Sequence, residues 1–164
     1  MSSAGASVPS TASSPAPPRV SIGETFARRL RLGADEIRDF ATLVGDHNPL
    51  HHDVVAARAA GYRTLIASGT QLGSVLMAMT ATHFAQPGAD RRPRLSLGLG
   101  FELTFRGPVY ADEDIDLRWT VTVVSWKQSL AGWLTLLSGD ARAGDRLLLA
   151  ATGTLLVRAP GGAR

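Results

Sequence analysis

An aspartate and a histidine five positions apart, Asp46 and His51, are the pair of side chains best suited to acid–base chemistry. Gly45 ends a helical pattern just before them, because glycine readily takes the left-handed conformation that stops a helix. The residue before Pro49 is pushed out of the helical region, so we expect a short, stiff, non-helical loop. A carboxylate and an imidazole on one such loop can hold and deprotonate a single water.

Two helices are expected to position this loop. Residues 34–44 carry apolar side chains at helical spacing, which predicts one buried face made by Ile37, Phe40, Ala41 and Val44. A second helix, over residues 69–84, is composed mainly of apolar and small residues and has no charged face. Such a helix is normally buried, so we expect it to lie at the centre of the fold.

The loop sequence also resembles a known family. Residues 40–53 read Phe-Ala-Thr-Leu-Val-Gly-Asp-His-Asn-Pro-Leu-His-His-Asp. This stretch closely resembles the hydratase-2 motif of the MaoC-like, (R)-specific enoyl-CoA hydratases, roughly Phe-Ala-x-x-x-Gly-Asp-x-Asn-Pro-x-His-x-Asp. The resemblance implies a single hot-dog domain. It also implies hydration of trans-2-enoyl thioesters to (R)-3-hydroxyacyl thioesters, and the reverse dehydration.

The resemblance assigns roles to individual residues. Asp46 and His51 would hold and deprotonate the water and return a proton to the α-carbon. Which of the two performs which step is left open. The backbone N–H of Gly69, at the positive start of a helix, would stabilise the thioester oxyanion. The family usually has His-Gly at this point, whereas this chain has Ser68 before the glycine. Support for the loop would come from Asn48, Asp53 and Ser68.

Each of these residues also has a purely structural interpretation. Asp46 could cap a turn, His51 could pack in the core, and Gly69 could be a packing glycine. A metal site formed by His47, His51, His52 and Asp53 is disfavoured, because the spacing is not that of a helical zinc motif. The sequence contains no cysteine. We therefore expect neither a metal nor a cofactor.

The fold class is predicted from the strand pattern. Apolar residues occupy every second position from Leu95 to Phe105, which is typical of a half-buried antiparallel strand. Similar patterns predict strands over residues 20–32, 115–123, 130–141 and 147–157. We expect an α+β, hot-dog arrangement, in which an antiparallel sheet of about five strands wraps around the long central helix.

The chain divides into three predicted segments. Residues 1–19 are rich in Ser, Ala and Pro and predict a disordered tail, residues 20–158 a single MaoC-like hot-dog domain, and residues 159–164 a C-terminal tail. The sequence has no signal-peptide pattern and no long apolar span, so we expect a cytoplasmic protein without membrane contact. A net charge of +3 and the absence of a basic run argue against nucleic acid.

The expected partners are the substrate and a second copy of the chain. The substrate would be an acyl-CoA or acyl-carrier-protein thioester, and edge-to-edge pairing of two sheets would form a homodimer. Two other functions remain open. The chain could be a non-catalytic hot-dog subunit of a heteromeric dehydratase, although such subunits would be expected to lack the aspartate–histidine pair. It could also be an acyl-CoA thioesterase, since the fold alone does not fix the reaction.

Overall fold

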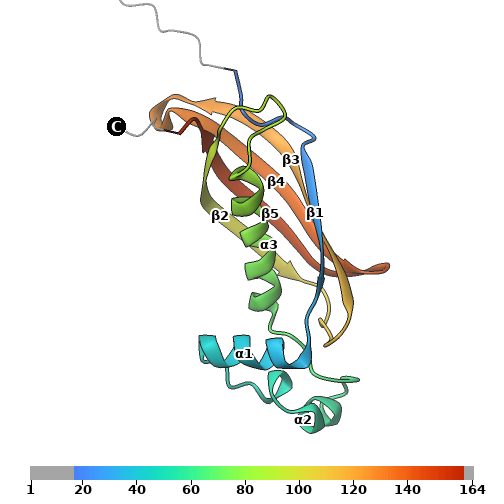
Figure 1. The fold of residues 1–164 in the computed structure, drawn as a ribbon. Helices are drawn as coiled ribbons and strands as arrows, with labels where there is room; N and C mark the ends of the chain where they lie inside the picture. The colour runs from blue at the N-terminus through green and yellow to red at the C-terminus, as the bar shows by residue number, and fades with distance from the viewer. Residues whose placement is uncertain (1–16, 161–164) are drawn as a thin grey trace, which may run out of the picture.

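The computed structural model describes residues 17–160. The chain forms a five-stranded sheet that curls around one long helix (Figure 1). The predicted tails, 1–19 and 159–164, lie mostly outside these residues. No helix in the described part of the chain is long and apolar enough to span a membrane. The helices and strands are, in chain order, β1 (Thr25–Arg31), α1 (Ala34–Val44), α2 (Val54–Ala59), α3 (Gly69–Phe84), β2 (Leu95–Phe105), β3 (Asp114–Lys127), β4 (Gly132–Ala143) and β5 (Arg146–Arg158).

The sheet is antiparallel throughout, with the strand order β1-β3-β4-β5-β2. Strands β3, β4 and β5 follow one another as neighbours, while β1 and β2 form the two edges. Helix α3 lies against the concave face of the sheet, and α1 and α2 sit together beyond its N-terminal end (Figure 1). The α+β architecture predicted from the sequence is confirmed.

The core lies between α3 and the sheet. Trp119 of β3 is fully buried there, and its indole N–H donates a 2.8 Å hydrogen bond to the carbonyl of Leu76 in α3. A Cβ on Gly139 of β4 would come within 2.4 Å of the Trp119 ring, so only glycine leaves room for it. The hydrogen bond satisfies the buried polar end of the indole and fixes the distance between helix and sheet.

Strand β2 departs from its sequence pattern. A β-bulge lies between Gly98 and Gly100, so Leu97 pairs with Leu156 whereas Phe101 pairs with Gly153. Because side chains alternate along β5, the bulge places Leu97 on the opposite face of the sheet from Phe101. The unbroken alternation had predicted one shared buried face, which is wrong: Leu95, Leu97 and Leu99 are 41–50% exposed.

Helix α1 has the predicted bounds, and its buried face is shorter than predicted. Ile37 and Ala41 are completely buried, but Val44 in the last turn is 52% exposed. Gly45 follows in the left-handed conformation, at φ 72°, and its N–H bonds back to the helix. The helix thus ends with its last turn beyond the core, and the chain turns sharply into the segment that contains Asp46.

Candidate active site

The segment from Asp46 to His51 is held by hydrogen bonds to its own side chains. The Asn48 N–H donates to Asp46 Oδ1 at 3.0 Å, and Asn48 Oδ1 accepts from the Leu50 N–H at 3.2 Å. Residues Pro49–His51 form a 3₁₀ turn, so the prediction of an entirely non-helical loop is wrong in its second half. Proline has the φ of a helical first residue and needs no amide partner there, so it can open a turn that it could not continue.

His51 is buried, with 6% of its surface exposed, and its ring orientation is fixed. Nδ1 lies 2.7 Å from the carbonyl oxygen of Ile66. A carbonyl oxygen can only accept, so Nδ1 must carry a hydrogen. In the neutral imidazole, Nε2 is then an acceptor with a free lone pair.

Nε2 of His51 faces the carboxylate of Asp46. The distance from Nε2 to Asp46 Oδ2 is 3.4 Å, longer than a good charge-assisted hydrogen bond. With His51 neutral and Asp46 ionised, two acceptors oppose each other, an arrangement that favours a donor bound to both. Water can satisfy both acceptors at once, because it has two hydrogens to donate.

The N-terminus of α3 adjoins this pair and offers unpaired amides. Ser68 is the N-cap residue, but its hydroxyl bonds to the Thr70 hydroxyl at 2.7 Å and caps no backbone N–H. Gly69 is the first residue of the helix, where N–H groups have no intrahelical acceptor and carry partial positive charge. This end of the helix is therefore suited to an oxygen that gains negative charge.

A cavity of about 470 Å³ joins His51 to the start of α3. Its polar side is formed by His51, Ser68, Gly69 and Thr70, and its remaining walls are mainly apolar, formed by Tyr62, Ile66, Ala67, Leu72, Phe105, Gly107, Pro108, Val109 and Leu148. Asp46 contacts His51 and is not part of the cavity lining. The structure thus brings His51 and Gly69 together around one partly apolar space, with Asp46 in contact with His51.

The other residues singled out in the sequence hold backbone in place. Asp53 caps α2, since its Oδ1 accepts from the Val55 N–H at 2.7 Å. The Nε2 atom of His52 lies 2.6 Å from the carbonyl oxygen of Asp46. His47 is exposed on the same short loop. Of the three neighbouring histidines, only His51 lines the cavity.

Two contributors to the site carry no signal in the sequence. The carbonyl of Ile66 fixes the His51 tautomer, but every residue has a carbonyl, and this one is 15 positions away. Phe105 belongs to the alternating pattern of β2 and gives no sign that its ring lines a cavity. Both assignments depend on which distant segments meet in the fold.

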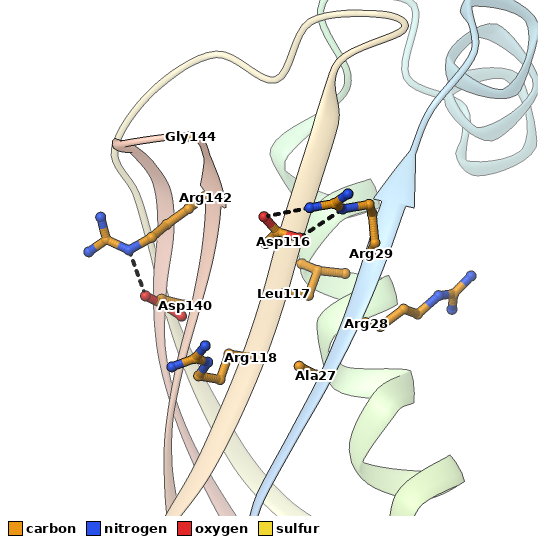
Figure 2. A pocket seen from close by; sticks show the side chains of 9 residues that line it. All are labelled: Ala27, Arg28, Arg29, Asp116, Leu117, Arg118, Asp140, Arg142 and Gly144. Carbon is orange, nitrogen blue, oxygen red and sulfur yellow. Dashed lines mark hydrogen bonds and ion pairs between the residues drawn. The ribbon is translucent and has the colours of Figure 1, made fainter.

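A second, larger hollow of about 550 Å³ lies on the outer face of the sheet (Figure 2). Four of its charged side chains form ion pairs: Arg29 bonds to Asp116 at 3.1 Å, and Arg142 to Asp140 at 2.9 Å. The Arg29 and Asp116 side chains are more than 60% exposed. We interpret this hollow as a solvated, charged surface, because its ion pairs are exposed and the described residues of its lining include no histidine.

Comparisons with known proteins agree with this architecture. Residues 21–148 match the family model described as "FAS1-like, dehydratase domain region". The chain is 27% identical to the (R)-specific enoyl-CoA hydratase of Aeromonas caviae over 85% of this chain and 95% of that protein. Three other curated relatives are matched over only 51–63% of their own length.

Solved structures with the same fold include two named as hydratase or dehydratase. The (R)-hydratase from A. caviae superposes with a TM-score of 0.71 at 24% identity, covering 86% of this chain and 98% of that one. The HadBC (3R-hydroxyacyl-ACP dehydratase) complex from Mycobacterium tuberculosis superposes with a TM-score of 0.69 at 18% identity, covering 84% and 98%. These likenesses establish the hot-dog fold predicted from the sequence.

Proposed function

The chain belongs to the FAS1-like dehydratase-region family of hot-dog proteins, and from this membership and the site geometry we propose that it is a hydro-lyase acting on acyl thioesters. It hydrates trans-2-enoyl thioesters to (R)-3-hydroxyacyl thioesters and catalyses the reverse dehydration. The observation that carries the proposal is the His51–Asp46 pair, whose acceptor atoms face each other at 3.4 Å beside the cavity.

The nucleophile in this mechanism is a water held between Nε2 of His51 and Oδ2 of Asp46. As its oxygen forms a bond to the β-carbon, one of its hydrogens passes to Nε2. The resulting imidazolium is stabilised by the Asp46 carboxylate and by its hydrogen bond to the Ile66 carbonyl. His51 receives the proton in this scheme because it lines the cavity, whereas Asp46 does not.

The negative charge that develops on the thioester oxygen requires a second group. Gly69 lines the cavity at the start of α3, and in this scheme its backbone N–H donates to that oxygen. Return of the proton from His51 to the α-carbon, with collapse of the enolate to the thioester, completes the addition. Dehydration uses the same steps in reverse. Every group in this scheme belongs to the chain, the water or the thioester, so the scheme uses no cofactor and no metal.

The substrate class rests on the relatives. The A. caviae protein is named an (R)-specific enoyl-CoA hydratase, and the M. tuberculosis complex a 3R-hydroxyacyl-ACP dehydratase. These names support the (R) configuration for this chain, and thioesters of either CoA or acyl carrier protein as its substrates.

The exposed edge strand β2 supports pairing with a second hot-dog chain. Its backbone edge is uncovered in the described structure, and leucines of 41–50% exposure lie along it. We propose a homodimer, to be tested by light scattering of the purified protein. Co-purification with a different hot-dog chain would instead favour a heteromeric complex like that of M. tuberculosis.

The activity is tested by adding crotonyl-CoA and following the loss of the conjugated enoyl absorbance. We expect turnover, and chiral analysis should give the (R)-3-hydroxy product. Absence of turnover by folded protein on short- and medium-chain enoyl thioesters of both CoA and carrier protein would refute the proposal. A thiol reagent in a parallel assay detects thioesterase activity, which would release free CoA.

A further inference from the structure

The proposed function leaves open which acyl chains the cavity accepts. The residues that line the cavity limit the length of the chain. With the thioester oxygen at the Gly69 N–H and the β-carbon beside His51, the acyl tail must lie against the apolar part of the lining. Leu72 and Leu148 of that lining are completely buried. They belong to the packed core, so a longer tail cannot pass them without disrupting the fold.

Phe105 forms the wall between the cavity and the seam where α3 meets β2. A Cβ on Gly69 would lie 2.8–3.1 Å from three atoms of the Phe105 ring. One helical turn further on, a Cβ on Gly73 would lie 2.6 Å from Leu103 Cδ1. The two glycines allow β2 to approach α3 so closely that Phe105 and then Leu103 fill the seam.

Phe105 is less tightly enclosed than the core residues of the cavity wall. It lies at the end of an edge strand and is 51% exposed, whereas Val109 is 3% exposed. Removing its ring would open the seam next to Gly69 without leaving a cavity in the centre of the core. On the side of Gly69, the size of the Phe105 side chain therefore limits the depth available to an acyl tail.

We propose that Phe105 is a specificity-determining residue that restricts the site to short-chain acyl thioesters, the crotonyl class. This inference rests on the proposed function for the identity of the ligand. It adds the direction in which the acyl tail runs, toward the seam between α3 and β2, and the side chain that stops it. Leu103 becomes the next contact once the Phe105 ring is gone.

The test compares two chain lengths in three proteins. For wild type, Phe105→Ala and the control Leu97→Ala, kcat/KM is measured with crotonyl-CoA and with trans-2-octenoyl-CoA. Leu97 lies on the same strand with similar exposure but on the other face of the sheet. Wild type should prefer crotonyl-CoA, and Phe105→Ala should raise the octenoyl-to-crotonyl ratio by at least about 10-fold, as expected when apolar contacts for a few methylenes become available. Leu97→Ala should leave the ratio unchanged.

A binding measurement separates this inference from the proposed function. Dissociation constants for butyryl-CoA and octanoyl-CoA, which lack the double bond, report pocket depth without turnover. If Phe105→Ala favours octanoyl-CoA while the wild type hydrates nothing, the pocket assignment stands and the hydratase proposal fails. If a folded Phe105→Ala protein shows the wild-type ratio in both assays, or if wild type prefers the longer chain, the inference is overturned. Phe105→Leu serves as the milder variant should the alanine variant not fold.

Discussion

Residues 17–160 contain two histidine–carboxylate pairs, one at each end of α3, and they differ in what else they bond to. At the N-terminal end, His51 faces Asp46 at 3.4 Å and keeps an acceptor atom without a protein donor. At the C-terminal end, His83 Nε2 lies 2.7 Å from Glu24 Oε1, a full hydrogen bond. The first pair adjoins a cavity and the helix amides. His83 of the second pair also borders a hollow, of about 340 Å³, but its Nε2 is already bonded to Glu24.

The C-terminal pair is saturated by Arg94. That guanidinium is 1% exposed, lies 2.7 Å from the same Glu24 oxygen, and also donates to the carbonyls of His83 and Gln86 at the end of α3. The Phe26 ring stacks on His83 with centroids 4.0 Å apart. Burial acts to raise the pKa of Glu24, but hydrogen bonds from Arg94 and His83 outweigh it, so this pKa lies below its usual value.

The comparison shows that the same two residue types occur in two different hydrogen-bonding environments. A histidine and a carboxylate become reactive where an acceptor remains free and a ligand can reach it. The same types stabilise the fold where a buried arginine completes their hydrogen bonding. Substitutions that break one pair or the other test this difference.

The largest expected effect is on the N-terminal pair. Asp46→Asn keeps the shape of the side chain and places an amide donor against Nε2 of His51, where the water should bind. We expect kcat/KM with crotonyl-CoA to fall at least ~100-fold, with little change in the melting temperature. His51→Ala should lose as much. Asp39→Asn, on an exposed part of α1, is the control, and equal loss there would undermine the assignment.

Breaking the C-terminal pair should affect stability instead. Glu24→Gln leaves the buried Arg94 guanidinium without a carboxylate, so the free energy of unfolding should fall by about 3 kcal/mol. Activity per folded molecule should stay at the wild-type level. Urea unfolding measures the first quantity, with the exposed Glu102→Gln as control. A loss of turnover without a loss of stability would show that the C-terminal pair takes part in catalysis.

The free energy of unfolding at acid pH provides a finer comparison. Because the folded-state pKa of Glu24 is depressed below 4.5, its stabilising contribution is present above about that pH and is lost as the pH falls through the folded pKa. The difference in unfolding free energy between wild type and Glu24→Gln should therefore shrink below pH 4.5. A difference that stays constant down to strongly acidic pH would contradict the ionised pairing with Arg94.

The smallest expected effect concerns Ser68, which stands where the family usually has histidine. Its hydroxyl bonds to Thr70 rather than to the helix amides, and the proposed oxyanion donor is backbone. Ser68→Ala should therefore reduce kcat/KM by no more than about fivefold, the equivalent of one neutral hydrogen bond of about 1 kcal/mol. A loss comparable with that of Asp46→Asn would show that the hydroxyl itself contacts the substrate.

The sequence by itself determined the elements whose causes are local. The periodicity and the Gly45 stop define α1, and the run of apolar and small residues defines α3. The unusual spacing around Asp46 and His51 identifies the loop, and alternation locates the strands. It could not give the faces of β2, because a one-residue bulge reverses which side chains point inward. It also predicted burial for Val44, which lies in a helical turn that extends beyond the core.

Only the tertiary structure decided which of these parts cooperate. The His51 tautomer depends on the carbonyl of Ile66, and the shape of the cavity depends on Phe105 of the edge strand β2. The hydrogen bonding around His83 is completed by Arg94. Each of these contacts joins segments that are distant in sequence or uses backbone atoms that all residues share. Periodicity and spacing are local signals, whereas hydrogen-bond saturation and access to a cavity are set by which distant segments pack together.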